Sequence, residues 1–390
     1  MVHPKFIPYE LKLVTPDFDD DLTDLIIELD HLRRRKLEGT THPQVFFQLK
    51  HLFHTLESIG SARIEGNNTT IAEYIETTRL AESEETQVSY SIREIMNIEK
   101  AMEFIEEIVK DHPINKSFIS ELHQLIVKDL PIPPQGEGDK APGQYRSHPV
   151  KIAQSNHIPP APYQIDGYMD ELIQFLNNED ASKYDLLKIA IAHHRFVWIH
   201  PFGNGNGRTV RLFTYALLIK NGFNLNIGRI VNPTAVFCND RNEYYEHLAL
   251  ADSGTDKGIK AWCQYVLKGL KEEIEKIDKL LDYDFLKSEI LIPAINYSLE
   301  RKVITDTESK MLKVVIEKQV MQNVDLEPIF KGKAKSEISR QIKMLQEKKM
   351  LTSERDSVRK YVLRFDNNYL LRAVIHILSK KGFLPLNENL

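Results

Sequence analysis

The chain has 390 residues, and its 42% hydrophobic and 27% charged residues are ordinary for a globular protein of two or three domains. A net charge of -5 argues against a protein that coats nucleic acid over its whole surface. Two cysteines are too few for a disulfide framework, and with neither a signal peptide nor a membrane-length apolar run apparent, we expect a cytoplasmic protein without a membrane partner.

The first hundred residues predict an irregular arm followed by helices. Residues 1–15 carry prolines and aromatic side chains, which indicates an arm that packs on another part of the protein. Apolar residues at helical spacing then predict helices over 17–38, 43–60 and 91–110.

A short polar segment directly follows the second of these helices. Ser61 and Glu65 lie one helical turn apart, and Gly66 or Asn67 can adopt the left-handed conformation that ends a helix. Taken alone, these residues indicate only a helix end.

Residues 130–162 are rich in proline and glycine, so they cannot form a helix. They separate helices that we predict over 116–128 and 165–176. The residue order from 143 to 160 is compatible with a short β-hairpin, and equally with a plain connecting loop.

Residues 200–211 combine a histidine, three glycines and two arginines. Apolar stretches over 186–199 and 209–220 predict a buried helix on either side, and Pro201 ends the first of them. The glycines therefore lie at a helix N-terminus, where unpaired backbone N–H groups and a partial positive charge favour an anion. The pattern predicts a phosphate site.

The side chains of this stretch suit phosphate chemistry. Arg208 and Arg211 lie three apart on the first turn of the second helix and can add bidentate contacts, and His200 can act as a general base near neutral pH. The expected backbone cradle consists of Gly205, Asn206 and Gly207. The alternatives are a polar turn with a core histidine and solvated arginines, or a transition-metal site with His193 and His194, although no carboxylate or cysteine stands at ligand spacing beside these histidines.

This stretch resembles the signature of the Fic family, H-x-F-x-[DE]-G-N-G-R-x-x-R, and departs from it only at Asn204, where the family has an acid. The resemblance implies an all-α core and transfer of AMP from ATP to a hydroxyl of a target protein. It makes His200 the base, Arg211 the partner of the γ-phosphate, and Asn204 the stand-in for the acid that ligates Mg²⁺. A neutral amide oxygen should bind this metal more weakly. The other implied ATP and phosphate-binding residues are Gly205, Asn206, Gly207, Arg208 and Thr209.

The segment after the second helix also resembles a Fic motif, the inhibitory sequence [ST]-x-x-x-E-[GN], through Ser61, Glu65 and Gly66. In the family, this glutamate forms an ion pair with the second arginine of the signature, here Arg211. The resemblance therefore implies autoinhibition by a helix that precedes the catalytic core.

Two further parts of the site follow from the resemblance. The proline- and glycine-rich segment over 130–162 corresponds to the flap, whose edge strand pairs with the backbone of the target. The residues of this strand here are Val150, Lys151, Ile152 and Ala153. Helices are predicted over 239–252 and 258–281, and the first of these carries Tyr244 and Asp252 at the positions that line the adenine pocket. The family usually has asparagine where Asp252 stands.

The last hundred residues predict a separate module. Helical patterns over 307–318 and 336–348, two alternating stretches over 351–354 and 360–365, and a final helix over 367–382 resemble a winged helix-turn-helix. Residues 331–349 hold seven Lys/Arg against two Glu, the local basic excess that a DNA reader needs. Winged helices also serve as protein-docking or dimer modules, so both options stay open.

We therefore predict a mainly α protein with a Fic-fold helical core, a β-hairpin flap and a C-terminal winged-helix domain. The expected domains are 1–112 with the inhibitory motif, 113–282 as the catalytic core and 283–390. The expected function is autoinhibited transfer of AMP from ATP, with Mg²⁺, to a Ser, Thr or Tyr hydroxyl of a target protein and of the chain itself. Alternatives are a phosphotransferase like the Doc toxins, which also carry Asn at this acid position, and a DNA-binding regulator that senses nucleotide; a homodimer is left open.

Overall fold

The computed structural model describes residues 6–34, 39–83, 88–152, 155–223, 233–355, 357 and 359–384. The chain divides into two compact units, one formed by Met1–Lys36 with His54–Glu275 and the other by Leu37–Phe53 with Lys276–Leu390. The second unit thus includes residues 37–53, which the sequence-based division assigned to the N-terminal region. The predicted division within the first unit, after residue 112, stays a prediction.

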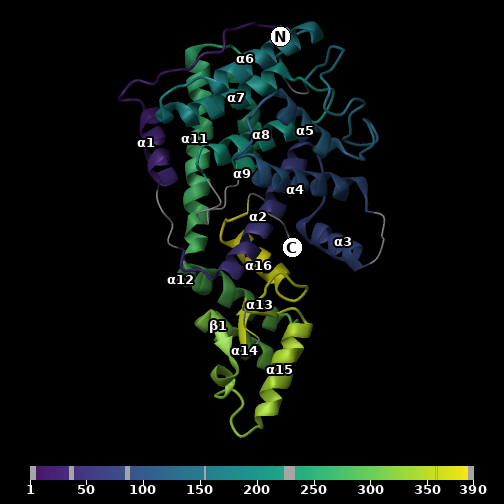
Figure 1. The fold of residues 1–390 in the computed structure, drawn as a ribbon, viewed down its shortest axis with the longest axis vertical. Helices are drawn as coiled ribbons and strands as arrows, with labels where there is room; N and C mark the ends of the chain where they lie inside the picture. The colour runs from purple at the N-terminus through teal and green to yellow at the C-terminus, as the bar shows by residue number, and fades with distance from the viewer. Residues whose placement is uncertain are drawn as a thin grey trace. The chain divides into compact units, whose positions relative to one another are not determined.

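The first unit is built from helices, most of which begin and end within a few residues of the predicted bounds (Figure 1). They are α1 (Asp21–Arg34), the second part of α2 (Pro43–Ile64), α3 (Ile71–Ser83), α4 (Tyr90–Ile108), α5 (Lys116–Val127), α6 (Ile165–Asn177), α7 (Asp185–Ile199), α8 (Asn206–Lys220), α9 (Pro233–Cys238), α10 (Arg241–Ala251) and α11 (Asp256–Asp278), with short 3-10 turns η1 (Pro162–Gln164) and η2 (Ser182–Tyr184).

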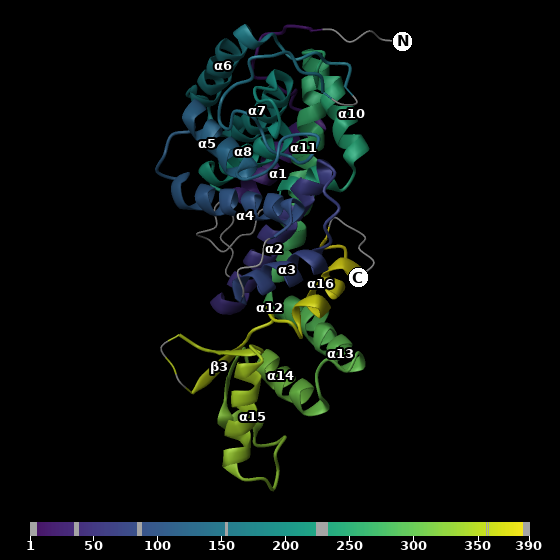
Figure 2. The same cartoon turned by 90° about the vertical axis from the view of Figure 1, so that its right-hand side faces the viewer.

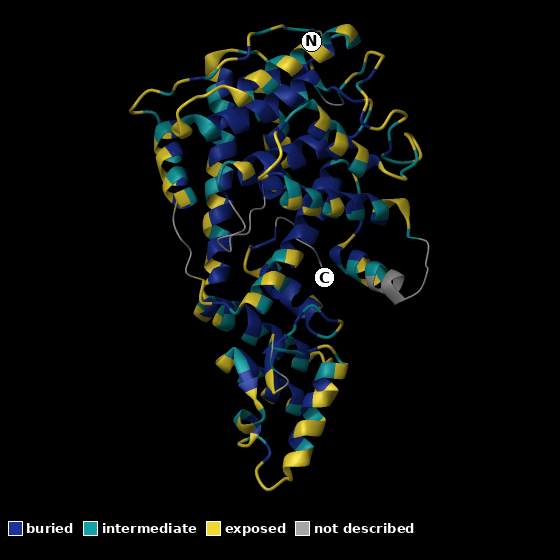
Figure 3. Cartoon of the chain, in the orientation of Figure 1, coloured by how far each residue is buried: buried dark blue, intermediate teal, exposed yellow. Residues whose placement is uncertain are grey.

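Helices α7 and α8 form the centre of this unit. They pack on each other, with α6 against α7 and with α4 and α5 against α8. Both central helices are buried along almost their whole length, as Figure 3 shows, because neighbouring helices cover them. Figure 2 shows α10 beside α11, where the rings of His247 and Tyr265 stack. The loop between α7 and α8 is therefore held by a rigid core.

The irregular N-terminal segment packs on this core, as its aromatic residues predict. The Tyr9 ring lies against Trp198 and over the guanidinium of Arg195, which is fully buried in α7. Arg195 is neutralised by Glu171 of α6. An aromatic cover of this kind stabilises a buried cation without adding charge.

The predicted β-hairpin over 143–160 is not formed in the described residues. Residues 143–152 and 155–161 contain no regular strand, although His157 makes an isolated bridge. Pro149, Pro159 and Pro160 have no N–H group to donate, so a continuous ladder cannot form there. The segment is instead an extended loop fastened by side chains.

The second unit combines short helices with a small sheet. After the first part of α2, it contains η4 (Lys279–Leu281), α12 (Tyr283–Phe285), the π-helical segment η5 (Leu286–Leu291), α13 (Ile292–Glu300), α14 (Asp306–Lys318), β1 (Val320–Gln322), η6 (Asn323–Leu326), α15 (Lys335–Glu347), β2 (Leu351–Ser353), β3 (Lys360–Leu363) and α16 (Leu371–Lys380).

The sheet of this unit has the antiparallel order β1-β3-β2. Strands β2 and β3 lie where alternation predicts them, whereas β1 is too short for its pattern to be seen in the sequence. The winged-helix assignment itself stays a prediction. None of the described helices is long and apolar enough to cross a membrane.

Candidate active site

A cavity of about 420 Å³ lies in the first unit beside the loop between α7 and α8. Its volume is in the range of small-molecule sites. The predicted site residues that line it are Glu65, Val150, Lys151, Ile152, His200, Asn204, Gly205, Asn206, Gly207, Arg211, Tyr244 and Asp252. Residues of the N-terminal region, the 130–162 segment and the core thus meet at one cavity.

Left-handed residues set the shape of the α7–α8 loop. His200 ends α7 with φ 51°, and Gly205 precedes α8 with φ 73°. Asn206 closes the loop, because its side chain accepts a hydrogen bond from Phe202 N and donates one to Phe202 O, both of 2.9 Å. The first backbone N–H groups of α8 therefore face the cavity from a fixed position, as an anion site requires.

His123 of α5 supports this loop from behind. Its Nδ1 accepts from Gly143 N at 2.8 Å, so Nε2 carries the proton that it donates to Asn204 O at 3.0 Å. Its ring also stacks on Phe202, with ring centroids 3.8 Å apart. Burial lowers the pKa of His123, which keeps the ring neutral.

His200 is placed to act as a base. Its Nδ1 lies 3.3 Å from Val197 O, an oxygen that can only accept, so Nε2 keeps its lone pair toward the cavity. Arg146 fastens the same position, since its Nε donates to His200 O at 2.8 Å and its Nη2 to Pro160 O at 2.7 Å. Burial lowers the pKa of His200 to about 4, which keeps the imidazole unprotonated at neutral pH.

This low pKa predicts a broad pH range for a reaction that uses His200 as the base. The neutral form of His200 persists down to about pH 4. The rate at which ATP labels the chain should therefore change little between pH 7.5 and 5.5. The measurement uses the Glu65→Gly variant, in which the Glu65 carboxylate no longer pairs with Arg211. With an ordinary histidine pKa near 6.5, the rate would fall about tenfold over this interval. Initial rates at both pH values measure the difference, and circular dichroism verifies that the protein stays folded. A tenfold fall would contradict the low pKa of His200.

Arg211 is neutralised by the end of α2. Its Nη2 lies 2.7 Å from Glu65 Oε1, its Nε donates to Ser61 Oγ at 2.8 Å, and Nη2 also donates to Ser61 O at 2.9 Å. Burial works against ionisation of Glu65, but the charge of Arg211 and its hydrogen bond hold the pKa of Glu65 below its usual value. The carboxylate also covers the start of α8, because a Cβ at Gly207 would collide with Glu65 Oε1. Glu65 thus occupies part of the predicted anion site.

Arg208 differs from its predicted position. Its side chain is fully buried and does not line the cavity. Its Nη1 lies 2.9 Å from Glu94 Oε1 of α4, and its Nη2 donates to Glu137 O at 2.7 Å. The guanidinium is therefore turned toward α4 and the 130–162 segment.

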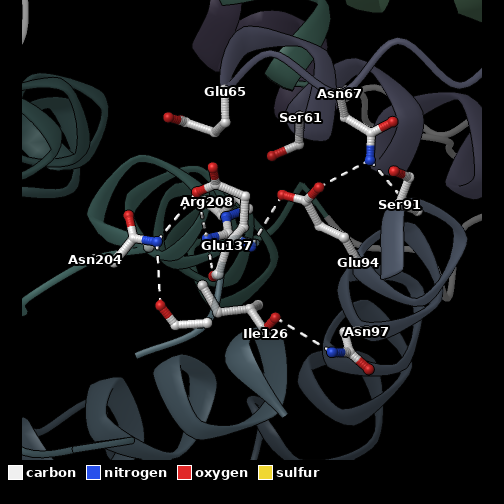
Figure 4. A network of polar contacts seen from close by, with 12 residues as sticks. Ser61, Glu65, Asn67, Ser91, Glu94, Asn97, Ile126, Glu137, Asn204 and Arg208 are labelled. Carbon is white, nitrogen blue, oxygen red and sulfur yellow. Dashed lines mark hydrogen bonds and ion pairs between the residues drawn. The ribbon is translucent and has the colours of Figure 1, made fainter. Parts of the chain in front are cut away.

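Asn204 lies beside two acidic residues of the 130–162 segment. Its backbone N donates to Asp139 Oδ2 at 2.7 Å. Its Nδ2 donates to Glu137 Oε2 at 3.1 Å, as Figure 4 shows. Across the described ranges, no three His, Cys, Asp or Glu side chains gather as a metal cluster. Nucleotide-bound Mg²⁺ typically takes one or two carboxylates together with phosphates and water, so the Glu137 carboxylate and the Asn204 amide oxygen fit this ion.

The far end of the cavity is aromatic and acidic. Tyr244 is buried, and its hydroxyl lies 3.0 Å from His193 Nε2. The neighbouring Tyr245 also lines the cavity and is less buried. Asp252 Oδ1 lies 3.0 Å from His194 Nε2, whose other ring nitrogen contacts the Tyr9 hydroxyl at 3.1 Å. Both of the adjacent histidines are thus held by core residues at this end.

Some predicted residues lie outside the cavity lining. Ser61 and Thr209 are buried and act through hydrogen bonds, Thr209 Oγ1 donating to Gly205 O at 2.9 Å. Gly66 ends α2 with φ 103°. Ala153 lies outside the described residues.

Several residues that build the site were not predicted from the sequence. They are His123, Glu137, Arg146, Tyr245 and Glu94. The G-x-Y-R order around Arg146 and the double tyrosine at 244–245 were visible signals, but His123, Glu94 and Glu137 stand in ordinary helix or loop patterns.

The chain thus presents a glycine-rich loop between two buried helices, with the Glu65 carboxylate beside the start of the second helix. The Fic/DOC family model matches residues 113–218. A Fic family protein from Desulfovibrio desulfuricans G20 has the same fold, with a TM-score of 0.55 and 18% identity over 91% of this chain and 98% of that chain.

Curated relatives agree with this assignment. The chain is 28% identical over 240 residues to a protein adenylyltransferase Fic of Nematostella vectensis and 32% identical over 251 residues to one of Drosophila virilis. These matches cover 60% and 63% of this chain but 48% and 45% of the relatives, so the chain spans about half of their length. Residues 113–218 of this chain are therefore similar to the Fic/DOC family, and the fold of the chain is similar to that of a Fic family protein.

Proposed function

We propose that this chain is an autoinhibited protein adenylyltransferase, which moves AMP from ATP to a hydroxyl of a target protein. The observation that carries the proposal is the meeting of His200, the anion loop and Arg211 at one cavity of nucleotide size. The names of the curated relatives, protein adenylyltransferase Fic, support the same reaction.

In the proposed reaction, the target hydroxyl approaches His200 from the flap side of the cavity. Nε2 of His200 takes the hydroxyl proton while the hydroxyl oxygen forms a bond to the α-phosphorus of ATP. The bond from this phosphorus to the bridging oxygen of the β-phosphate breaks, and pyrophosphate leaves with that electron pair. The N-terminal backbone of α8 stabilises the charge on the phosphate oxygens.

Glu137 and Asn204 would hold Mg²⁺ together with the phosphates, and the ion would neutralise charge on the leaving pyrophosphate. Tyr245, Asp252 and the buried Tyr244 would form the end of the site that takes the base. The segment Val150–Ile152 lies along the cavity and would present the target, whose modified residue is a Ser, Thr or Tyr of another protein or of this chain.

The decisive experiment uses ATP labelled at either the α- or the γ-phosphate. Transfer of the α-label to protein supports the proposal. Transfer of the γ-label alone would instead indicate a Doc-like phosphotransferase, a candidate that Asn204 favours and that the intact Gly205–Arg208 loop argues against. Absence of both labels, even from Glu65→Gly, would favour a nucleotide-sensing regulator.

Exposed basic residues in the second unit favour a nucleotide-sensing regulator that binds DNA. Lys335, Arg340 and Lys343 are exposed on α15, where they could meet DNA phosphates, and the same unit could equally dock a second copy of the chain. We take cytoplasmic location as part of the proposal, because a reducing compartment suits two unpaired cysteines.

Asn204→Asp should lower the Mg²⁺ concentration that gives half-maximal α-labelling. The substitution places a second carboxylate beside Glu137, and two adjacent carboxylates in a triphosphate site favour a divalent cation. The Mg²⁺ dependence of ATP binding, measured by calorimetry, should shift in the same direction. Asn156→Asp, which changes another amide of the cavity lining away from the loop, is the matched control, and an equal shift in both variants would contradict the metal assignment.

A further inference from the structure

Two arginines at the start of α8, Arg208 and Arg211, are each paired with a carboxylate from the N-terminal region. Glu65 pairs with Arg211, and Glu94 pairs with Arg208, as Figure 4 shows for the second pair. The Arg208 side chain is fully buried and that of Glu94 is 4% exposed. A phosphate in the cavity must therefore compete with Glu94 for the charge of Arg208.

Glu94 is also connected to the inhibitory segment. Asn67, two residues after Glu65, donates from Nδ2 to Glu94 Oε2 at 2.8 Å and to Ser91 O at 2.9 Å. Asn67 Oδ1 accepts from Thr69 N at 2.9 Å, which fixes the chain directly after α2. One carboxylate on α4 thus contacts both the loop arginine and the end of α2 (Figure 4).

The pair between Glu94 and Arg208 is not arranged for stability alone. Burial raises the pKa of Glu94 even though Arg208 stands beside it, so desolvation outweighs the attraction. Glu94 Oε1 and Arg208 Nη1 are close but not aligned as a hydrogen bond, and Arg208 Nε also has no hydrogen-bond partner among the described residues. Arg208 therefore keeps donors that an anion could satisfy.

We propose that Glu94 is a positioning residue that holds Arg208 away from the phosphate site, and that Asn67 ties this restraint to the docked end of α2. It acts beside the Glu65–Arg211 pair as a second restraint on the phosphates beyond the α-phosphate. Without the Glu94 charge, the carboxylate nearest to the buried Arg208 is that of Glu137, whose Oε2 lies 3.5 Å from Nη2, and a nucleotide β-phosphate becomes a stronger partner for the guanidinium. The inference rests on the proposed function, because it requires that the cavity takes a nucleotide.

The test measures the dissociation constants of ADP and AMP for the full chain by calorimetry. Glu94→Gln keeps the size of the side chain and an oxygen for Asn67 but removes the charge. We expect ADP to bind about tenfold more tightly, as for one added charge-assisted contact, while AMP binds as before. Asn67→Ala should tighten ADP binding by a smaller factor, because Glu94 stays charged. Glu103→Gln, which removes an exposed carboxylate from α4, is the control for net charge and should change neither constant.

An unchanged ratio of ADP to AMP affinity in Glu94→Gln would overturn the inference, and so would an equal change in Glu103→Gln. A merely structural Glu94 would lower the melting temperature without changing this ratio. If Glu94→Gln does not fold, Asn67→Ala decides, since Asn67 is only half-buried and an unchanged ADP affinity in that variant also overturns the inference. If neither the wild type nor Glu65→Gly binds any nucleotide, the proposed function itself fails.

Discussion

Glu65→Gly should raise auto-labelling with α-labelled ATP by about 30- to 150-fold, since a partly buried, charge-assisted pair of this kind is worth on the order of 2–3 kcal/mol. The Glu65 carboxylate lies 2.7 Å from Arg211 Nη2 and covers the first turn of α8. The γ-phosphate must displace it to reach Arg211. Removal of the Glu65 carboxylate therefore has two effects: it opens the space over the first turn of α8, and it frees Arg211 to bind the γ-phosphate.

Two further variants separate the ion pair from other effects at the end of α2. Glu65→Gln keeps the side chain but not the charge, so it should also activate, by a smaller factor than glycine does. Activation by glycine but not by glutamine would attribute the effect to a loosened helix end. The double variant Glu65→Gly with Arg211→Ala should label far less than Glu65→Gly alone, because the γ-phosphate then has no partner; an active double variant would contradict the role of Arg211.

His200→Ala should lower the labelling rate of the activated Glu65→Gly chain by about 10²- to 10⁴-fold, the usual contribution of a general base. The side chain lines the cavity, and its Nδ1 faces Val197 O, so Nε2 is the nitrogen of His200 that can take the proton. Single-turnover rates measure the loss. The dissociation constant of ATP should stay the same, because the phosphates are held by α8 and Arg211.

A second histidine provides the matched control for this prediction. His148 lies in the flap segment with an exposed side chain outside the cavity lining, so His148→Ala in the same activated chain should label at nearly the full rate. Equal losses in both variants would indicate a general effect on the flap. Full activity of His200→Ala would contradict the assignment of His200 as the general base.

Arg208 is the clearest difference between the sequence and the structure. As a member of the loop it is expected to contact phosphate, yet its guanidinium lies against Glu94 and Glu137 O. Residues 94 and 208 are more than a hundred positions apart, so no local pattern relates them. The flap segment differs from the predicted hairpin for another reason. A strand forms only if a neighbouring segment can exchange backbone hydrogen bonds with it, and the prolines of this segment have no N–H group to donate.

By itself, the sequence determined the helices of the core and the loop between α7 and α8. Their signals are local, namely apolar residues at helical spacing, Pro201 and the glycines, and local signals do not depend on what packs nearby. It also identified Glu65 and Arg211 as partners, through a family resemblance rather than through spacing. Only the tertiary structure decided which carboxylate faces which cation, how His123 and Arg146 hold the loop, and that Glu137 stands beside Asn204. Those choices depend on contacts between distant segments in a buried site, where distance and desolvation, not sequence order, set the energy.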